Sequence, residues 1–180
     1  MFSARTTRKD DLRQQIALIA LHLDNKNQRE GSELMRIILG YVAAVLAAYL
    51  IGCIAISQGN IAAVVGMGFE VTLSQRLESA QHDVLSMTAL YLPIISVSFL
   101  IALPAAALVI KRYPNLRRLG FVLGGFVALV AIHLIIKQVF GISGIAPTRT
   151  IMGLVMQGVA GAFGGYCYYR LTTPKLAGSE

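Results

Sequence analysis

The sequence has few charged residues, and acidic ones above all are scarce. Only 14% of the 180 residues are charged and 56% are hydrophobic, while Asp and Glu together number 9 against 16 Lys and Arg. This composition argues against an ordinary soluble enzyme, because soluble domains of this size carry more charge. Abundant Leu, Ile, Val and Ala exclude intrinsic disorder, and only 2 cysteines exclude a disulfide scaffold. An integral membrane protein remains.

Four windows of the sequence contain no charged residue. A helix needs about 20 apolar residues to cross a hydrocarbon core of about 30 Å, and the windows at 37–57, 84–110, 119–136 and 150–169 approach or exceed that length. A lone strand cannot satisfy its backbone in lipid, so each window predicts a helix. We therefore expect an all-α integral membrane protein whose four transmembrane helices, at about 37–57, 84–110, 119–139 and 150–169, form an antiparallel bundle.

The distribution of Lys and Arg predicts the orientation of this bundle. Residues 1–36, the connection 111–118 and residues 170–180 hold thirteen of the sixteen Lys and Arg, and such segments stay on the cytoplasmic side. The first 35 residues lack the pattern of a cleaved signal peptide. We expect both termini in the cytoplasm of a bacterium, with an N-terminal segment at 1–35, a domain in the inner membrane at 36–170 and a tail at 171–180.

Two connecting segments are expected to contain short helices. Residues 10–24 form a possible amphipathic helix that rests on the membrane or binds a partner, and residues 25–32 suggest a polar linker. On the outer side, residues 61–69 suggest an interfacial or re-entrant piece. Thr72 and Gln75 predict a capping box that starts an amphipathic extracytoplasmic helix at 72–83. This helix is either a cap or docking face, or a plain connector.

The connection between the second and third windows is short and basic. Its four cations, Lys111, Arg112, Arg117 and Arg118, attract anionic lipid or act only as a topology anchor. In the second window, Pro93 and Pro104 fall on nearly the same helix face and predict a kink. That kink is either a hinge or a fixed bend that opens space in the bundle.

Small residues recur at four-residue spacing in every window. In lipid, such faces let helices approach closely, so they predict helix contacts within the chain, with a second copy or with another membrane subunit. The predicted packing residues are Gly40, Ala44, Ala48, Gly52, Gly120, Gly124, Gly153, Gly161 and Gly165.

Several kinds of chemistry have no matching residues. The windows hold no Asp or Glu, which argues against a small proton-coupled antiporter and an intramembrane aspartyl protease, and no pair of histidines that would hold a haem. Cys53 and Cys167 fall near opposite ends of their helices, so a joint thiol mechanism is excluded. The sequence also lacks a phosphate loop, HExxH, paired CxxC and a serine elbow. No metal site or nucleic acid is indicated, and the sequence does not identify a cofactor.

One polar group from each window falls at a similar predicted depth. Tyr49, Tyr91, His133 and Gln157 are each about 10 to 12 Å from the outer surface by residue count. They predict either an intramembrane polar layer that contacts a ligand, or ordinary packing in which His133 and Gln157 join two helices.

The sequence favours a non-catalytic accessory or scaffold subunit of a membrane complex, which binds partner helices or lipid through its small-residue faces. The alternative is a small transporter or channel component whose polar layer, Tyr49, Tyr91, His133 and Gln157, contacts a solute. A membrane enzyme that uses His82, Asp83 or His133 ranks third, because a helix directs adjacent side chains about 100° apart.

Overall fold

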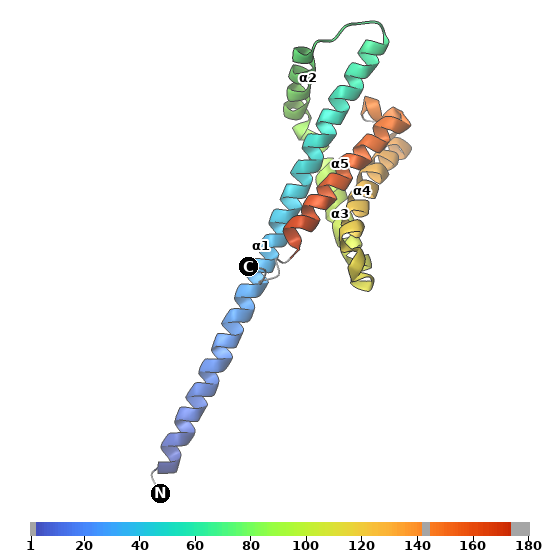
Figure 1. The fold of residues 1–180 in the computed structure, drawn as a ribbon. Helices are drawn as coiled ribbons and strands as arrows, with labels where there is room; N and C mark the ends of the chain where they lie inside the picture. The colour runs from blue at the N-terminus through green and yellow to red at the C-terminus, as the bar shows by residue number, and fades with distance from the viewer. Residues whose placement is uncertain (1–2, 142–144, 174–180) are drawn as a thin grey trace. The chain divides into compact units, whose positions relative to one another are not determined.

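A computed structural model of the chain describes residues 3–141 and 145–173, with side chains from residue 18 onward. Within these residues the fold is almost entirely helical and contains no strand (Figure 1). The helices are α1 (Ser3–Gly66), α2 (Leu73–Ser86), α3 (Tyr91–Arg112), α4 (Arg117–Phe140) and α5 (Ile151–Thr172), with short 3₁₀ turns η1 (Met87–Ala89), η2 (Pro114–Leu116) and η3 (Ala146–Arg149). The all-helical class expected from the sequence is confirmed.

The chain divides into two compact units, residues 1–38 and residues 39–180. In the first unit the described side chains, 18–38, are all exposed. The predicted polar linker at 25–32 is wrong, because these residues are helical. Lys26 and Glu30 form an ion pair at 3.9 Å and the Gln28 amide donates to Asp24 at 3.3 Å, and such pairs four residues apart stabilise a helix.

In the second unit, α1 continues to Gly66, so the prediction of a separate interfacial piece at 61–69 is also wrong for most of its length. Ala and Val residues continue the helix without a break. The turn after α1 contains Gly68, whose φ of 92° is favourable only for glycine, and its N–H donates to the Val65 carbonyl at 2.9 Å.

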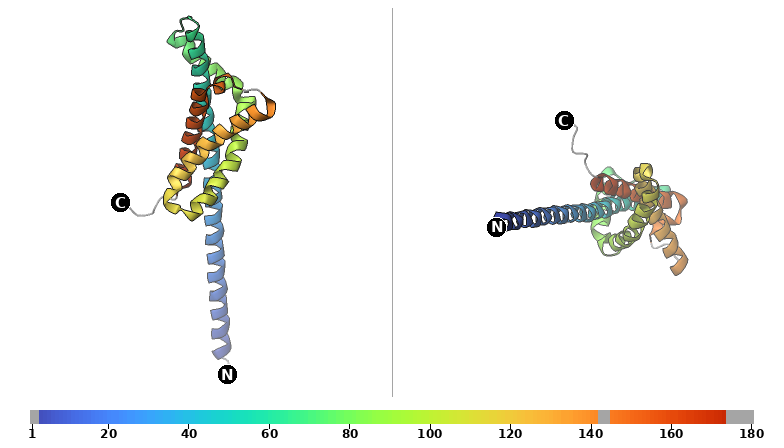
Figure 2. Two further views of the ribbon diagram at one scale, coloured as in Figure 1. Left: turned by 90° about the vertical axis from the view of Figure 1, so that its right-hand side faces the viewer. Right: turned by 90° about the horizontal axis from the view of Figure 1, so that it is seen from below.

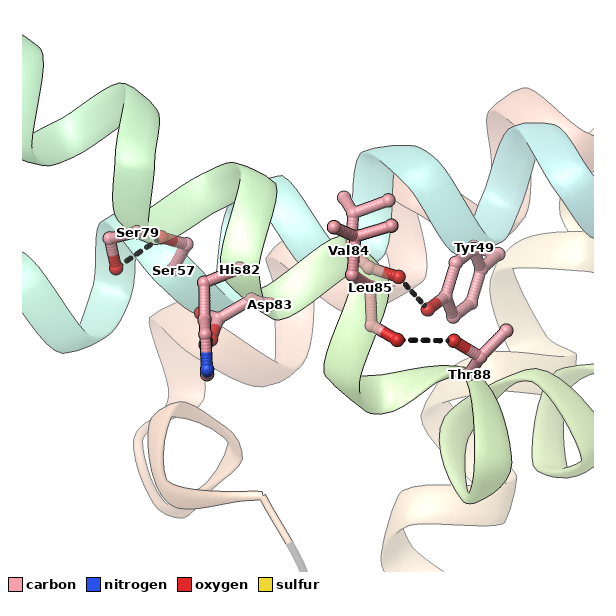
Figure 3. Close-up of polar contacts among 8 residues, drawn as sticks. All are labelled: Tyr49, Ser57, Ser79, His82, Asp83, Val84, Leu85 and Thr88. Carbon is pink, nitrogen blue, oxygen red and sulfur yellow. Dashed lines mark hydrogen bonds and ion pairs between the residues drawn. The ribbon is translucent and has the colours of Figure 1, made fainter.

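The predicted capping box at the start of α2 is confirmed. The Thr72 hydroxyl accepts from the Gln75 N–H at 3.3 Å, and the Gln75 side chain accepts from the Thr72 N–H at 2.9 Å. α2 then runs antiparallel to α1, since Arg76 donates to Gln58 at 3.1 Å and, farther along α2, Ser79 bonds to Ser57 at 3.1 Å (Figure 3). The short connecting helix is thus fixed along its length to α1.

Helix α3 starts later than expected. Residues 84–86 belong to α2 and the 3₁₀ turn η1 follows, so α3 begins at Tyr91. Pro93 therefore lies in the first turn, where a missing N–H costs no intrahelical bond, and only Pro104 interrupts the helix interior. The prediction that both prolines lie mid-helix is wrong for Pro93.

α3 and α4 form an antiparallel pair joined by the short turn η2, which Figure 2 shows from a second side. α4 ends at Phe140 and is followed by Gly141, whose φ is 68°. α5 packs along α4 and is capped at its start by Thr150, whose side chain accepts from the Gly153 N–H at 3.1 Å. The tail from residue 174, predicted to be cytoplasmic, lies outside the described residues.

Within the described part of the chain, three helical segments are long and apolar enough to cross a membrane: Leu18–Gly66, Tyr91–Arg112 and Pro114–Phe140. α5 is not among them, although it has 22 residues. Its glycines, tyrosines and Gln157 make it less apolar than α3 or α4. The core of the second unit consists of buried side chains from α1, α3, α4 and α5, including Ala48, Ile95, Phe99, Leu129 and Ala160.

Candidate intramembrane site

The polar groups predicted at one depth come together where α1, α3 and α5 meet. The Tyr91 hydroxyl donates to the side-chain oxygen of Gln157, and the Gln157 amide donates to the Gly52 carbonyl at 3.3 Å. Tyr91 and Gln157 are each 1% exposed. This chain of bonds links three helices that are distant in the sequence.

Gly52 makes this arrangement possible. A Cβ at residue 52 would collide with the Tyr91 hydroxyl and lie 3.1 Å from the Gln157 oxygen. Glycine therefore provides the space in which the two side chains bond to each other and to its own carbonyl. The small-residue spacing in the first window identified Gly52 as a contact residue, but it gave no sign that a polar bond would form there.

Tyr49 binds at the same level to a different element. Its hydroxyl donates to the Val84 carbonyl at 2.5 Å, which connects α1 with the last turns of α2 (Figure 3). Its ring lies 5.9 Å from the Tyr91 ring, centroid to centroid. Tyr49 thus packs its ring against Tyr91 while its hydroxyl donates to the Val84 carbonyl.

His133 contributes to the layer from α4. Its ring lies edge-on to Tyr91 with the centroids 6.1 Å apart, and its Nδ1 lies 2.7 Å from the Leu129 carbonyl oxygen. Among the described residues the His133 Nε2 has no hydrogen-bond partner, although it is buried. The structure shows no His133–Gln157 bond in this part of the chain, because Gln157 bonds to Tyr91 and Gly52 instead.

The depth assigned to Tyr91 needs correction. The sequence window places it seven residues inside a helix, whereas it is the first residue of α3. The 22 residues of α3 rise about 33 Å, roughly one hydrocarbon core. The polar layer therefore lies level with the N-terminal end of α3.

A cavity of about 650 Å³ lies against Tyr91 and His133. Its size is typical of sites for small apolar ligands. It is lined by Ser86, Met87, Leu90, Tyr91, Pro93, Ile94, Val97, Ile132, His133, Ile136, Phe140 and Ile145. A second groove, of about 550 Å³, continues along α3 and α4, shares Ile132 with the first and is lined almost entirely by apolar residues, among them Ala102, Ala106, Gly120 and Gly124.

Most of the predicted small-residue positions are used within the chain. A Cβ on Gly161 would collide with the Gly125 carbonyl, and one on Gly165 with the Phe121 carbonyl, so α4 and α5 pack backbone to backbone. Ala44 and Ala48 are fully buried. Other members also face neighbours: Gly40 faces Thr172, Gly120 faces Ile110, Gly124 faces Ala106, and Gly153 faces the preceding Pro147 carbonyl rather than another helix.

Two further glycines have equally close neighbours that the four-residue spacing missed. Gly158 faces the Phe126 ring, and Gly164 faces the Ala44 carbonyl and the Phe99 ring. The sequence did hold a signal for them: α5 contains more glycines than a single helix–helix contact requires, which indicates a second contact face. α5 is in close contact with helices on more than one side.

The basic turn at 111–118 carries four cations, of which one bonds within the chain and three are exposed. Arg117 donates to the Thr172 carbonyl at 3.1 Å and lies 5.6 Å from the centre of the Phe121 ring, a position that satisfies the C-terminal end of α5. Lys111, Arg112 and Arg118 are exposed. These three remain candidates for anionic lipid, whereas one guanidinium nitrogen of Arg117 already has a partner within the chain.

The other chemically active groups are dispersed. His82 and Asp83, which sequence reasoning expected to diverge, approach to 3.5 Å between Nδ1 and Oδ1, but the His82 side chain is 78% exposed (Figure 3). Cys53 and Cys167 are both free thiols. Among the side chains that the structure describes, at 18–141 and 145–173, no group of three or more metal-ligating residues occurs.

Comparison of the chain with protein-family models, with curated proteins and with solved structures finds no match of any of the three kinds.

Proposed function

We propose that this chain is a non-catalytic accessory subunit of a bacterial inner-membrane complex, with four membrane-spanning helices and both termini in the cytoplasm. α5 would be the fourth span: it is about 33 Å long at 1.5 Å per residue and lies antiparallel to α4 along a glycine contact. Its lower hydropathy is compatible with this role, because close packing against a neighbour replaces lipid contact.

The groove of about 550 Å³ between α3 and α4 carries this proposal. Small residues on α1, on α5 and around Gly125 are buried by contacts inside the chain, whereas the small residues that line this groove contact only α3 and α4 and are half-buried: Ala102, Ala106, Gly120 and Gly124. Ala102 and Ala106 on α3 and Gly120 and Gly124 on α4 form its floor, and Ser98 is its one polar lining residue. A surface of this kind suits a helix of another membrane subunit, since small residues allow close backbone approach.

The interior supports a structural role as well. The buried hydroxyl and amide groups of Tyr49, Tyr91 and Gln157 bond to one another or to backbone. Such a network stabilises a single packing arrangement. A conduit would instead require polar groups that face a continuous path.

The proposal is tested by native mass spectrometry of the protein extracted in mild detergent from its own membrane, combined with photo-crosslinking. A crosslinker at Ala105 or Val127, both on the groove, should capture one defined subunit, and one at Val155 on α5, which is 41% exposed, should not. Ala106→Leu should reduce the complex without loss of the folded protein. A product of twice the chain mass, or a monomer in the native membrane, would contradict an accessory subunit.

The topology has its own test. In a chain with Cys53→Ala and Cys167→Ala, single cysteines at Asn27, Ser74, Asn115 and Gly178 report their side through an impermeant maleimide. We expect Ser74→Cys to react in intact cells and the other three to react only after permeabilisation. A Gly178→Cys variant that reacts from outside would show that α5 does not cross.

A small transporter or channel component is the second candidate. The cavity of about 650 Å³ that reaches Tyr91 and His133 favours it. Its test is flux in liposomes, which His133→Ala and Gln157→Ala must change. Flux that is absent, or equal in both variants and the parent, would exclude it.

A further inference from the structure

The second unit separates its charges by sign. All carboxylates among its described residues lie on the connection after α1 or on α2: Glu70, Glu78 and Asp83. The opposite end of the unit consists of the turn between α3 and α4 together with the last turn of α5. We call its five cations the basic end: Lys111, Arg112, Arg117, Arg118 and Arg170. The 22 residues of α3, about 33 Å, separate the basic end from η1 and α2, so no described carboxylate of this unit neutralises it.

Contacts between α4 and α5 bring the cations of the basic end to one level. Arg117 donates to the Thr172 carbonyl at 3.1 Å, and the Arg118 guanidinium lies over the Tyr166 ring, 5.6 Å from its centre. Arg170 belongs to the same last turns of α5. Within the described part of the chain no cation of the basic end forms an ion pair, and all except Arg117 are exposed. Their charge is therefore available to a partner.

Local structure accounts for the other cations of the turn but not for Arg118. Lys111 and Arg112 lie in the last turn of α3, where the helix dipole favours a positive charge. Arg117 bonds to the end of α5. Arg118 lies in the first turn of α4, where the dipole disfavours a cation. The contact with Tyr166 offsets part of this cost and orders the guanidinium. An anion that pairs with Arg118 would offset the rest.

The position of Arg118 indicates which anion it meets. α3 is about as long as one hydrocarbon core is thick, so the turn after it lies at the level of the lipid headgroups. Tyrosines are typical of that level, and Tyr113 in the turn is 57% exposed while Tyr166 is half-buried. The anion at that level is the phosphate of a phospholipid. Arginine pairs with phosphate through two parallel N–H donors, and a stacked guanidinium keeps the donors at its edge free.

We propose that the basic end binds an anionic phospholipid, whose phosphate pairs with the Arg118 guanidinium on the Tyr166 ring. The exposed cations around it attract the negative charge of the lipid: Lys111, Arg112 and Arg170. In the proposed topology this end faces the cytoplasmic leaflet, where anionic lipids attract basic segments. Neither Arg118 nor Tyr166 lines the partner-helix groove. Ala106→Leu should therefore leave lipid binding unchanged, so a failure of the lipid site and a failure of the subunit proposal can be told apart.

The experiment is a titration of the full chain in detergent, followed by native mass spectrometry. The probes are phosphatidylglycerol, phosphatidylcholine with the same acyl chains, and glycerol 3-phosphate as a soluble phosphate. We expect phosphatidylglycerol to bind about tenfold more tightly than phosphatidylcholine, whose choline group cancels the phosphate charge, and more tightly than glycerol 3-phosphate.

A double substitution distinguishes a binding site from a simple count of positive charges. Arg118→Gln combined with Asn115→Arg keeps four cations in the turn at 111–118, so the topology should not change. We expect the preference for phosphatidylglycerol to fall about fivefold, the loss expected for one cation at the headgroup level. Arg149→Gln is the matched control. It removes an exposed arginine at the other end of α5 and should leave the preference unchanged.

The Tyr166 ring provides a test that leaves every charge in place. Tyr166→Leu removes the ring and should weaken phosphatidylglycerol binding, whereas Tyr166→Phe keeps the ring and should not. Thermal unfolding without lipid checks that each variant is folded. Arg118 and Asn115 are both exposed, so the double variant should fold even where Tyr166→Leu does not.

Four outcomes would overturn the lipid site at the basic end. These are equal binding of the two phospholipids, an unchanged preference in the double variant, an equal loss in Arg149→Gln, and equal binding by folded Tyr166→Leu and Tyr166→Phe. Binding of glycerol 3-phosphate as tight as that of phosphatidylglycerol would show a site for free phosphate compounds and would overturn a lipid as the ligand.

Discussion

Gly125 on α4 and Gly161 on α5 face each other backbone to backbone, so that a Cβ on either would collide with the carbonyl oxygen of the other. Gly165 repeats the contact against the Phe121 carbonyl. The residue numbers in the two pairs have the same sum, as expected for antiparallel helices in constant register. This interface holds the α5 backbone directly against the α4 backbone.

Gly161→Ala should therefore destabilise the protein. The added methyl has backbone on its far side and cannot be accommodated by a side-chain rotation, so we expect a loss of about 2 kcal/mol, within the usual range for overpacking. Thermal unfolding in detergent measures the change. Gly31→Ala is the matched control: residue 31 is helical and has nothing within 4 Å, so alanine there should stabilise by about 1 kcal/mol. Equal effects at both positions would contradict the tight interface.

The bond between Tyr91 and Gln157 gives a second prediction. Tyr91→Phe leaves the Gln157 oxygen buried without its donor, at an expected cost of about 1 kcal/mol. Adding Gln157→Leu should recover part of that loss, since the unsatisfied oxygen is removed. A double-mutant cycle on unfolding temperature measures the coupling, and Tyr113→Phe, at a residue 57% exposed, serves as the control. Strict additivity of the two substitutions would argue against a direct bond.

Arg117 is expected to secure the C-terminal end of α5. Arg117→Gln removes the guanidinium that donates to the Thr172 carbonyl, so the last turn of α5 should open more often. The rate at which a maleimide labels Cys167, in a Cys53→Ala background, reports this opening and should rise severalfold. Lys111→Gln, at an exposed residue of the same basic turn, should leave the rate unchanged. A rise of the same size in both variants would indicate a general charge effect.

The capping box supplies a local test at α2. Thr72→Ala removes the hydroxyl that accepts from the Gln75 N–H, and we expect a loss of about 1 kcal/mol in the local stability of the helix start. Hydrogen exchange at the Gln75 amide should accelerate, while exchange in α4 stays the same. Ser74→Ala is the control, because its hydroxyl bonds to Glu78 on the surface rather than to backbone. Unchanged exchange at Gln75 would show that the cap contributes nothing.

Local patterns predicted local structure well. Thr72 and Gln75 identified the start of α2, because a capping box depends only on residues three positions apart. Apolar length likewise predicted the helices that became α3 and α4. The start of α3 at Tyr91 was missed, because residues 84–90 are apolar enough for a membrane helix but form the end of α2 and a 3₁₀ turn instead.

The sequence indicated which polar residues lie near one another, but not which of them bond. Counting residues placed Tyr49, Tyr91, His133 and Gln157 at one level, and the structure brings their rings and amide close together. The bonds depend on the directions of the side chains and on the space left at Gly52. The spacing of polar residues in the sequence gives neither. That the His133 Nε2 has no hydrogen-bond partner among the described residues is a property of the packed fold alone.

The glycines of α5 also bear on how the chain enters a membrane. They lower the hydropathy of α5 below that of α3 and α4, while the same residues give it its contact with α4. In the proposed topology, α5 would be a weak insertion signal alone and a stable span once α4 is beside it. α4 and α5 would then insert into the membrane as a pair. A substitution at Gly125, which lies on α4, would impair the integration of α5.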